Sequence, residues 1–147
     1  MGLVLVPATV EDVDDYVRIA RLNTSRFNIT PIDREKVLDA IARSVVYMIC
    51  VDRAAVGIAS YAMRSLAHAY LSELQVEPAF RGKGIGGYAL AAILQELERI
   101  EVVDLLTHPE NPARELYRRH GFQQVGEAIE DHRGTGEPRI RMLLVRG

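Results

Sequence analysis

The sequence predicts an α/β or α+β fold in which helices cover the faces of one mixed sheet. The chain has 147 residues, 48% of them hydrophobic and 26% charged, which suits a single globular domain over residues 1–147. Short apolar runs rich in Val and Ile alternate with segments whose apolar residues recur every three or four positions. In chain order these segments are strand, two helices, three strands, helix, strand, helix and two strands, so we expect a mixed sheet.

The first third of the chain predicts a strand followed by two capped helices. An apolar run covers residues 3–6, and Thr9 then precedes acidic residues as an N-cap residue does. Asp33 is expected to cap the second helix. The polar segment between the helices, residues 23–31, carries Phe27, and loops of this kind often line substrate pockets.

Three strands are expected next, and the first two form a hairpin. Residues 44–51 and 54–63 are apolar runs on either side of Asp52-Arg53, which predicts a tight turn although it lacks an Asn-Gly or Asp-Gly pair. A third run, residues 69–76, leads into a glycine-rich loop through Pro78, which cannot continue a central strand.

The second half predicts two more helices and three more strands. Apolar residues step by three or four from Ile85 to Ile100, which indicates a helix packed on the sheet. Residues 102–107 predict a strand, after which Asn111-Pro112 supplies an N-cap and a first helical residue. That short helix is expected to end at Gly121, a suitable residue for the left-handed C′ position. The last two expected strands are residues 123–127 and 139–145.

Charge and cysteine content narrow the partners and the compartment. Lys and Arg number 18 against 20 Asp and Glu, so the formal net charge of -2 gives no overall attraction to nucleic acid or to an anionic membrane. No apolar stretch approaches the roughly 18 residues of a membrane span, and the N-terminus lacks the basic start of a signal peptide. A single cysteine, Cys50, excludes an internal disulfide and fits a reducing compartment, so we expect a cytoplasmic protein.

Two further observations concern reactive and metal-binding groups. Cys50 lies in an apolar run without an activating neighbour, so we interpret it as a buried structural thiol. The four histidines lack the spacing of metal ligands, and no metal is expected.

The glycine-rich loop Arg81-Gly82-Lys83-Gly84-Ile85-Gly86 predicts a phosphate site. Glycine lets backbone N–H groups approach a phosphate, and the N-terminus of the following helix adds partial positive charge. Lys83 is followed by Gly84, which excludes the Gly-Lys-Ser/Thr pattern of phosphate-binding kinases. Gly82, Gly84 and Gly87 do match the dinucleotide-binding pattern, but too little chain follows for a dinucleotide domain. The two cations in the loop favour a ligand with several phosphates, such as CoA.

Two blocks resemble the GNAT superfamily of acetyltransferases. Leu74-Gln75-Val76-Glu77-Pro78, followed by Arg81-x-x-Gly84-x-Gly86, resembles the acetyl-CoA motif of that family. The block from Asn111 to Phe122 is similar to its Asn-x-x-Ala…Leu-Tyr…Gly-Phe helix, although Asn111 and Ala113 are one residue closer than in that pattern. Outside residues 74–122 the resemblance rests on element order.

The resemblance implies an architecture and a cosubstrate. We expect a mixed, mostly antiparallel central sheet of about six to seven strands with about four helices on its faces. The strand that carries Leu74 to Val76 should splay from the strand of residues 102–106, so that the pantetheine of acetyl-CoA lies in the gap like an added strand. The expected cofactor-binding residues are Leu74, Gln75, Val76, Arg81, Gly82, Lys83, Gly84, Ile85, Gly86, Gly87, Asn111, Ala113, Arg114 and Tyr117.

The resemblance also implies direct transfer of the acetyl group to a primary amine in a ternary complex. An alkyl amine has a pKa near that of lysine, about 10.4, so a base is needed, and Glu73 is the first candidate, acting directly or through water. Glu77 is the weaker substitute. The backbone N–H of Val76 resembles the family's donor to the carbonyl oxygen, and Tyr117 resembles the group that protonates or hydrogen-bonds the departing thiolate.

The sequence leaves the acceptor open. A small-molecule amine, a peptide N-terminus and a lysine side chain all remain, and we expect contacts from Phe27, Tyr61, His68 and residues 130–138. A homodimer is common among such small transferases. The main alternative from another class is a non-catalytic CoA-binding sensor or interaction module on the same fold, and the dinucleotide interpretation is a third.

Overall fold

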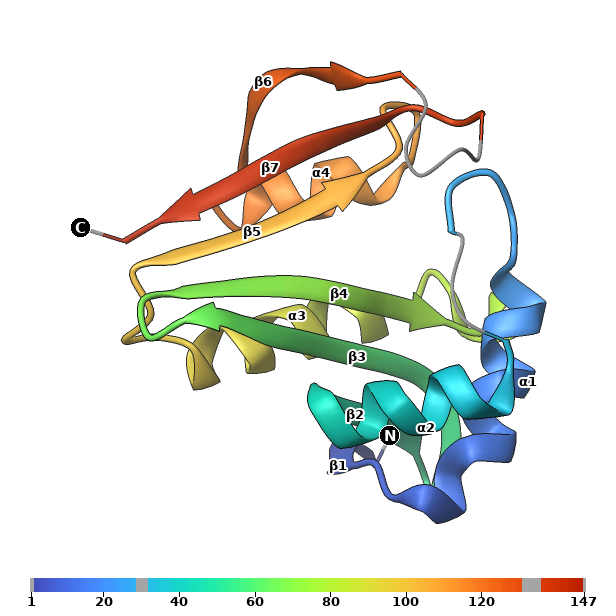
Figure 1. Ribbon diagram of the computed structural model, residues 1–147. Coiled ribbons are helices and arrows are strands. Elements are labelled where there is room, and N and C mark those ends of the chain that lie inside the picture. Colours follow the sequence, from blue (N-terminus) through green and yellow to red (C-terminus); the bar gives the residue numbers. More distant parts are fainter. Residues whose placement is uncertain (1, 29–31, 131–135, 147) are drawn as a thin grey trace.

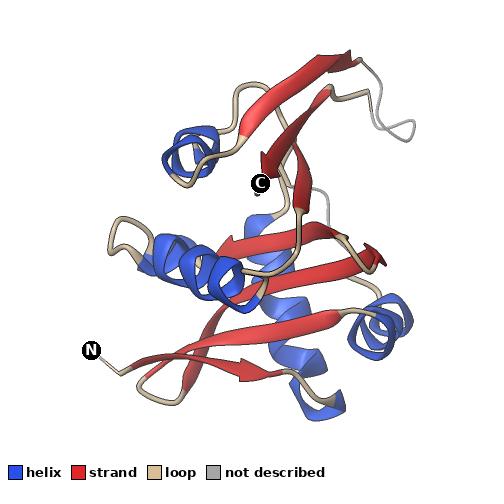
Figure 2. Cartoon of the chain, turned by 90° about the vertical axis from the view of Figure 1, so that its left-hand side faces the viewer, coloured by secondary structure: helices blue, strands red, loops and turns tan. Residues whose placement is uncertain are grey.

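A seven-stranded sheet with helices on both faces forms the protein (Figures 1 and 2). The computed structural model describes residues 2–28, 32–130 and 136–146. The strands are β1 (Leu3–Pro7), β2 (Val45–Val51), β3 (Ala54–Ser65), β4 (His68–Val76), β5 (Val102–Thr107), β6 (Gln123–Ile129) and β7 (Arg139–Val145). The helices are α1 (Val13–Asn23), α2 (Arg34–Arg43), α3 (Ile85–Glu96) and α4 (Ala113–Arg119), with short 3-10 turns at Val10–Asp12 and Pro78–Phe80. The expected α/β architecture, with its mixed and mostly antiparallel sheet, is confirmed.

The strand order β1-β2-β3-β4-β5-β7-β6 contains one parallel pair, β4 with β5, and every other neighbouring pair is antiparallel. The parallel ladder runs only from the pair His68–Val102 to the pair Tyr70–Asp104. Beyond it the two strands separate, which divides the sheet into a β1–β4 part and a β5–β7 part (Figure 1). The splay that the family resemblance implies is therefore present.

A β-bulge lies in β4 just past the end of the parallel ladder. The pairing with β3 passes from Ser60–Glu73 to Tyr61–Leu71, so Ser72 is an extra residue on β4. A bulge bends its strand and increases the local twist. It therefore lies where β4 leaves β5, and it places Ser72 close to Ser60, with their hydroxyl oxygens 2.8 Å apart.

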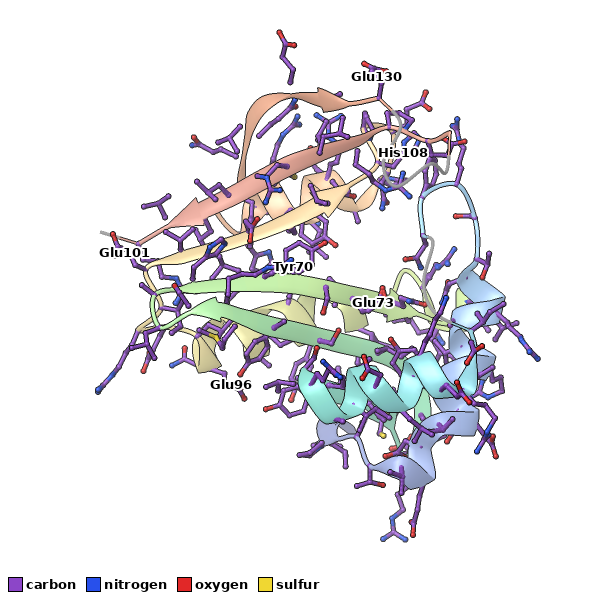
Figure 3. All side chains as sticks on the ribbon, viewed as in Figure 1. Tyr70, Glu73, Glu96, Glu101, His108 and Glu130 are labelled. Carbon is purple, nitrogen blue, oxygen red and sulfur yellow. The ribbon has the colours of Figure 1, made fainter. Side chains whose placement is uncertain are left out.

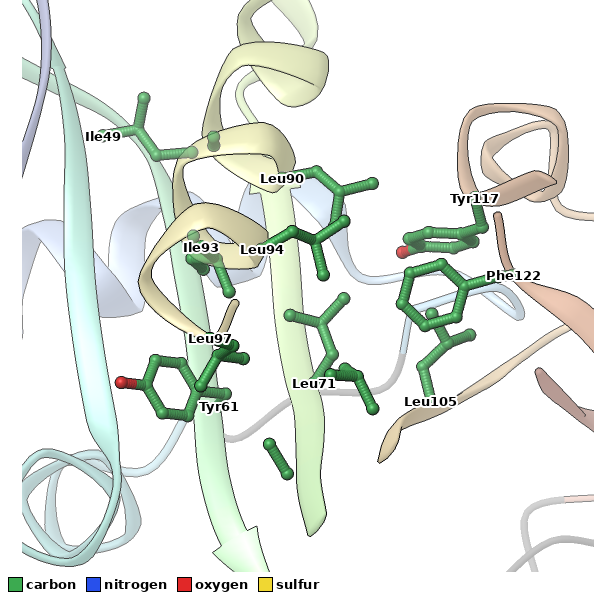
Figure 4. Packing of buried hydrophobic residues seen from close by; sticks show 14 of the residues in the cluster. Ile49, Tyr61, Leu71, Leu90, Ile93, Leu94, Leu97, Leu105, Tyr117 and Phe122 are labelled. Atoms are coloured by element: carbon green, nitrogen blue, oxygen red, sulfur yellow. The ribbon is translucent and has the colours of Figure 1, made fainter. Parts of the chain in front are cut away.

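Two hydrophobic clusters lie on opposite faces of the sheet. One lies under α3 and α4 and includes Leu90 and Ile93 of α3 together with Tyr117 and Phe122 (Figure 4). The other lies under α1 and α2 and includes Tyr16 of the first helix, which is 1% exposed. This packing holds the helices on the sheet. It thereby positions the end of α1 and the start of α4 beside the opening between β4 and β5.

The predicted caps and the predicted turn are confirmed. The Thr9 hydroxyl accepts a hydrogen bond from the N–H of Glu11 at 3.3 Å. The Asp33 carboxylate accepts from the N–H of Glu35 at 2.8 Å. Asp52 and Arg53 adopt positive φ angles of 49° and 73° and join β2 to β3. The hairpin therefore forms without a glycine in its turn.

Three details of the sequence interpretation were wrong. The α-helical part of α3 ends at Glu96 rather than near Ile100, because the segment from Leu97 onward continues the apolar packing as a turn. The helix α4 begins at Ala113, one residue later than expected, although the Asn111 side chain still caps it by accepting from the Ala113 N–H at 2.9 Å. Cys50 is half-buried rather than buried, and desolvation raises the pKa of its thiol, so it stays a poor nucleophile.

Candidate active site

A cavity of about 400 Å³ lies where β4 and β5 separate. Its walls come from the end of α1 and the following loop, from β4 and β5, and from the start of α4. The lining residues are Asn23, Ser25, Phe27, Asn28, Leu71, Ser72, Glu73, Leu74, Gln75, Val76, Arg81, Leu105, Leu106, Thr107, Asn111, Pro112, Ala113 and Tyr117. Half of the predicted cofactor-binding residues therefore meet in one place, namely Leu74, Gln75, Val76, Arg81, Asn111, Ala113 and Tyr117. The loop residues Gly82, Lys83, Gly84, Ile85, Gly86 and Gly87 are not part of the lining.

The glycine-rich loop reaches the cavity through Arg81 and turns into α3 at Gly84. Gly82 and Gly84 both have a φ of +77°, which favours glycine, and an added Cβ would meet no atom within 4 Å at either. No side chain caps the start of α3, and Arg81 and Lys83 are exposed beside it. An open helix N-terminus flanked by two cations fits a pyrophosphate group.

Arg81 also connects this loop to α1. Its guanidinium donates a hydrogen bond to Oδ1 of Asn23. Asn23 is 5% exposed, and its side-chain amide donates to the Ile19 carbonyl at 3.1 Å. The cavity wall formed by α1 is thus fixed to the wall formed by the loop.

Tyr117 of α4 projects into the cavity from the α3 and α4 face of the sheet. Its ring packs edge-to-face on Phe122, with centroids 6.0 Å apart, and the side chain is 8% exposed (Figure 4). Burial, followed by the negative charge of Glu73 and then of Tyr70, raises the pKa of the phenol above its ordinary value. Tyr117 therefore carries its proton throughout the neutral pH range.

Glu73 and Gln75 of β4 project from the opposite face, toward α1. Gln75 pairs with Ile58, which belongs to the cluster under α1 and α2, whereas Leu74 packs against the cluster under α3 and α4. Residues two apart on a strand share a face, and the Gln75 Nε2 donates to the Glu73 Oε2 at 3.3 Å. Figure 3 shows Glu73 beside the opening between β4 and β5. The carboxylate and the Tyr117 phenol thus reach the cavity from opposite sides of the sheet.

The backbone of β4 beyond Tyr70 has no strand pairing on its β5 side within the described sheet. Leu74 and Val76 lie in this stretch and line the cavity. An extended ligand can hydrogen-bond to such an edge as an added strand does.

The structure places several of the predicted contacts outside the cavity. Tyr61 is 7% exposed and donates to the Glu96 carboxylate at 2.5 Å, because its strand position turns it toward α3. His68 lies in the first pair of the parallel ladder between β4 and β5, away from the opening. Its Nε2 is 2.7 Å from Oδ1 of Asp104. Glu77 forms an ion pair with Arg18 and is absent from the lining. This placement does not support Glu77 as a substitute base, and that role stays an untested prediction.

Two other predicted contacts, Arg114 and Phe27, differ in where the structure places them. Arg114 donates to the Pro109 carbonyl beside the start of α4 and does not line the cavity. Phe27 does line it, as predicted. Within the expected acceptor segment 130–138, residues 131–135 lie outside the described part of the chain, as do residues 29–31 of the loop after α1.

The sequence did not reveal how the loop that carries Phe27 is held against the β5–β7 part of the sheet. Phe27 packs on the ring of His108, with centroids 4.9 Å apart, and the Arg139 guanidinium donates to the Arg26 carbonyl at 3.0 Å. His108 is 2% exposed, and its Nδ1 accepts a hydrogen bond from the Glu110 N–H at 3.0 Å. Nε2 therefore carries the ring proton, and it lies 2.9 Å from the Glu137 carboxylate. These contacts join segments far apart in the chain, and no local pattern signals them.

A family model described as an acetyltransferase (GNAT) domain matches residues 42–124 of the chain. The chain belongs to the GNAT acetyltransferase family. The matched segment includes β2 to β5, the glycine-rich loop and α4. A search of curated proteins returned no significant match.

Solved structures share the whole GNAT fold. The Ard1 protein of Thermoplasma volcanium is similar with a TM-score of 0.84 and 18% identity, covering 99% of this chain and 98% of that one. PaiA N-acetyltransferase of Thermoplasma acidophilum, solved in complex with coenzyme A, has a TM-score of 0.79 and 19% identity, covering 99% and 100%. A ribosomal-protein-alanine N-acetyltransferase of Brucella melitensis has a TM-score of 0.78 and 24% identity, covering 97% and 99%. At these identities the likeness shows the fold alone.

The described residues of this GNAT protein also bear on membranes and on metal ions. None of its described helices combines the length and the apolar character that a membrane crossing requires. Across residues 2–28, 32–130 and 136–146, no group of three or more His, Cys, Asp or Glu side chains is arranged to hold a metal ion.

Proposed function

We propose that this GNAT protein transfers the acetyl group of acetyl-CoA to a primary amine by direct attack in a ternary complex. The observation that carries the proposal is the cavity at the β4–β5 opening, which Glu73 lines from one face of the sheet and Tyr117 from the other. The open N-terminus of α3 lies beside it. A structure solved with coenzyme A on the same fold supports the choice of cosubstrate.

The proposed position of acetyl-CoA follows from charge and backbone geometry. The loop around Gly84 holds the pyrophosphate through backbone N–H groups, with Arg81 and Lys83 as counter-charges. The pantetheine runs along the unpaired edge of β4. The backbone N–H of Val76 stabilises the negative charge that develops on the thioester carbonyl oxygen.

Glu73 is the proposed base for the acceptor. An ammonium group must lose a proton before its nitrogen can attack, and a carboxylate at the cavity wall accepts that proton directly or through one water. The nitrogen then forms a bond to the carbonyl carbon, and the carbon–sulfur bond breaks.

Tyr117 is the proposed partner of the departing sulfur. Because burial raises the pKa of its phenol far above the value of about 8.5 for a thiol, outright proton loss to the thiolate is uphill. We therefore assign Tyr117 the role of a hydrogen-bond donor that stabilises the thiolate while it leaves. This choice between protonation and hydrogen bonding was open from the sequence alone.

A non-catalytic CoA-binding module is the alternative function, and binding and turnover separate the two. Calorimetric titration with acetyl-CoA, CoA and NAD should give binding of the first two only, and selective binding of NAD would contradict the proposed cosubstrate. Thiol release is then measured with a panel of small primary amines, peptides with free N-termini and lysine peptides. We expect at least one class to accelerate it. Binding of acetyl-CoA without acceleration by any amine would favour the module.

A further inference from the structure

Gln75 has a buried polar atom that the described residues leave without a hydrogen-bond partner. The side chain is 3% exposed and lines the cavity between β4 and β5. Its Nε2 donates to Glu73, while its Oε1 is buried without a partner among the described residues. A buried carbonyl oxygen left unsatisfied is costly, which makes this atom a candidate for contact with a ligand.

The orientation of the Gln75 amide follows from its neighbour. An ionised carboxylate is only an acceptor, so the NH₂ group must face Glu73 and the carbonyl oxygen must face elsewhere. The opposite orientation would place two acceptors in contact. The side chain leaves β4 toward α1, on the same side of the sheet as Glu73 and opposite to Leu74.

We propose that Gln75 binds the acceptor directly: its Oε1 accepts a hydrogen bond from one N–H of a primary amine while Glu73 accepts the proton from the other. This role rests on the proposed transferase function and is separate from any backbone contact of β4 with the cosubstrate. It also makes Gln75 a positioning residue for the Glu73 carboxylate through the 3.3 Å hydrogen bond.

The separation of the two oxygens suits one nitrogen. The C=O and C–N bonds of an amide are about 1.2 and 1.3 Å long, so Oε1 of Gln75 lies within roughly 6 Å of the Glu73 oxygen that is 3.3 Å from Nε2. Two hydrogen bonds of about 3 Å made by one tetrahedral nitrogen reach two oxygens about 5 Å apart, which lies within that limit.

The proton count then specifies the acceptor. When a primary amine attacks, its nitrogen carries the alkyl group, the new bond to the carbonyl carbon and two hydrogens. The proton that the ammonium group lost before attack has by then passed through Glu73 to solvent, so the carboxylate is ionised again. One of the two remaining protons moves to Glu73, and the electrons of the broken carbon–sulfur bond leave with the thiolate. The last N–H stays hydrogen-bonded to Gln75 and becomes the amide N–H of the product. A secondary amine has only one hydrogen at this stage and cannot satisfy both residues. We therefore infer selectivity for primary over secondary amines.

The test compares Gln75→Met with Gln124→Met, a matched change at an exposed residue of β6. The substrates are the best primary amine of the panel and its N-methyl derivative. For Gln75→Met we expect kcat/KM of the primary amine to fall by about 10- to 100-fold. That of the N-methyl amine should fall by a clearly smaller factor, because this amine loses only the positioning of Glu73 and no hydrogen bond of its own. The Kd of acetyl-CoA, measured by calorimetry, should stay within about twofold of the wild-type value.

Two results would overturn the inference. One is an unchanged kcat/KM for the primary amine in Gln75→Met. The other is an equal loss for both amines and for acetyl-CoA affinity, which would show a structural role only. If the wild-type protein itself shows no amine-dependent thiol release, the proposed function fails, and that outcome is distinct from either of these.

Gln75→Glu tests the same role if the methionine variant does not fold. It retains an oxygen acceptor, so the preference for the primary amine should survive. It also places a second carboxylate against Glu73, which raises the pKa of the pair and moves the acidic limb of the kcat/KM profile to higher pH. Loss of the preference in this variant, with no movement of the acidic limb, would contradict both parts of the proposed role.

Discussion

Tyr117 is a buried phenol in the cavity, and its proton is retained because desolvation opposes ionisation. We expect Tyr117→Phe to lower kcat by about 10- to 100-fold, because the leaving thiolate loses one hydrogen bond to a buried donor. The ring packing on Phe122 is preserved in this variant, so the melting temperature should change little. Rates of thiol release with saturating substrates measure the effect. Tyr88→Phe, at an exposed residue of α3, is the control. Full turnover of Tyr117→Phe with chemistry rate-limiting would remove the assignment.

Glu73 is the residue on which the pH dependence of transfer should depend. Replacing it by glutamine removes the base and keeps the shape, so we expect the largest loss of rate at low pH, where the amine most needs deprotonation. Acetyl-CoA affinity should stay close to that of the wild type. The measurement is a pH profile of kcat/KM beside that of Glu77→Gln, whose carboxylate is paired with Arg18 and lies outside the cavity lining. A profile of Glu73→Gln superimposable on that of the wild type would exclude Glu73 from the mechanism.

At this scale the sequence was most informative where a residue acts within a local pattern. Arg81 and Tyr117 belong to blocks with fixed spacing, and the structure brings both to one cavity. Tyr61 was placed at the acceptor side without such a pattern, and its side chain points to α3 instead. The orientation of a strand residue depends on register, and register is set by pairing that the sequence does not display.

At the scale of elements, the turn into α3 gives a test that separates folding from binding. Gly84 and Gly126 have φ angles of +77° and +70°, and an added Cβ would meet nothing at either. Alanine at either position should therefore cost a similar conformational penalty, of about 1 kcal/mol in the free energy of unfolding. Only Gly84→Ala should also raise the Kd of CoA, because the side chain intrudes where the backbone is proposed to approach the pyrophosphate. Equal CoA affinity in the two variants would contradict the proposed phosphate site.

A second element-scale test concerns how α3 is held on the sheet. The Glu96 carboxylate accepts hydrogen bonds from the phenols of Tyr47 and Tyr61, each at 2.5 Å. Glu96→Ala removes both, and we expect the free energy of unfolding to fall by about 1 to 2 kcal/mol in urea denaturation. Glu98→Ala, at an exposed position on the turn after α3, should have less effect. Equal stability of the two variants would show that the tyrosine contacts contribute nothing.

Elements whose ends are set by short-range chemistry were predicted closely. Thr9, Asp33 and the turn at Asp52-Arg53 all act as expected. The end of α3 was placed too late because apolar spacing reports burial, and Leu97 stays 3% exposed after the helix has ended. Periodicity alone cannot separate the last turn of a helix from a buried turn that follows it.

At the scale of the whole molecule, three tyrosines set the expected response to alkaline pH. Hydrogen bonding to Glu96 raises the pKa of Tyr47 to about 12, and burial raises those of Tyr61 and Tyr117. In the unfolded chain these phenols ionise near pH 10, whereas the folded protein keeps them protonated to higher pH. Their contribution to stability is thus fully present below about pH 10 and is lost as the pH rises toward the folded-state pKa values.

The matching measurement is the melting temperature as a function of pH. It should fall steeply above about pH 10, and Tyr61→Phe should reduce the slope whereas Tyr88→Phe should not. A slope identical in all three proteins would mean that the phenols ionise equally in the folded and unfolded states.

The overall architecture was predictable because element order and two spaced motifs constrain it strongly. The parallel pair that ends at Tyr70–Asp104 and then opens follows from that architecture. The contacts from Phe27 to His108 and from Arg139 to the Arg26 carbonyl were not predictable, since they join separate segments across the molecule. The part of the cavity wall that carries Phe27 is held by such contacts, which explains why its shape could not be read from local sequence patterns.

The central claim is that the acetyl group moves from acetyl-CoA to the nitrogen of a primary amine. The most direct measurement supplies acetyl-CoA labelled in its acetyl group together with the best amine of the panel, and follows the label by mass spectrometry. We expect labelled amide in an amount equal to the thiol released, with none when the amine is left out. Label that accumulates as free acetate, or that stays on acetyl-CoA while the amine is unchanged, would contradict the account.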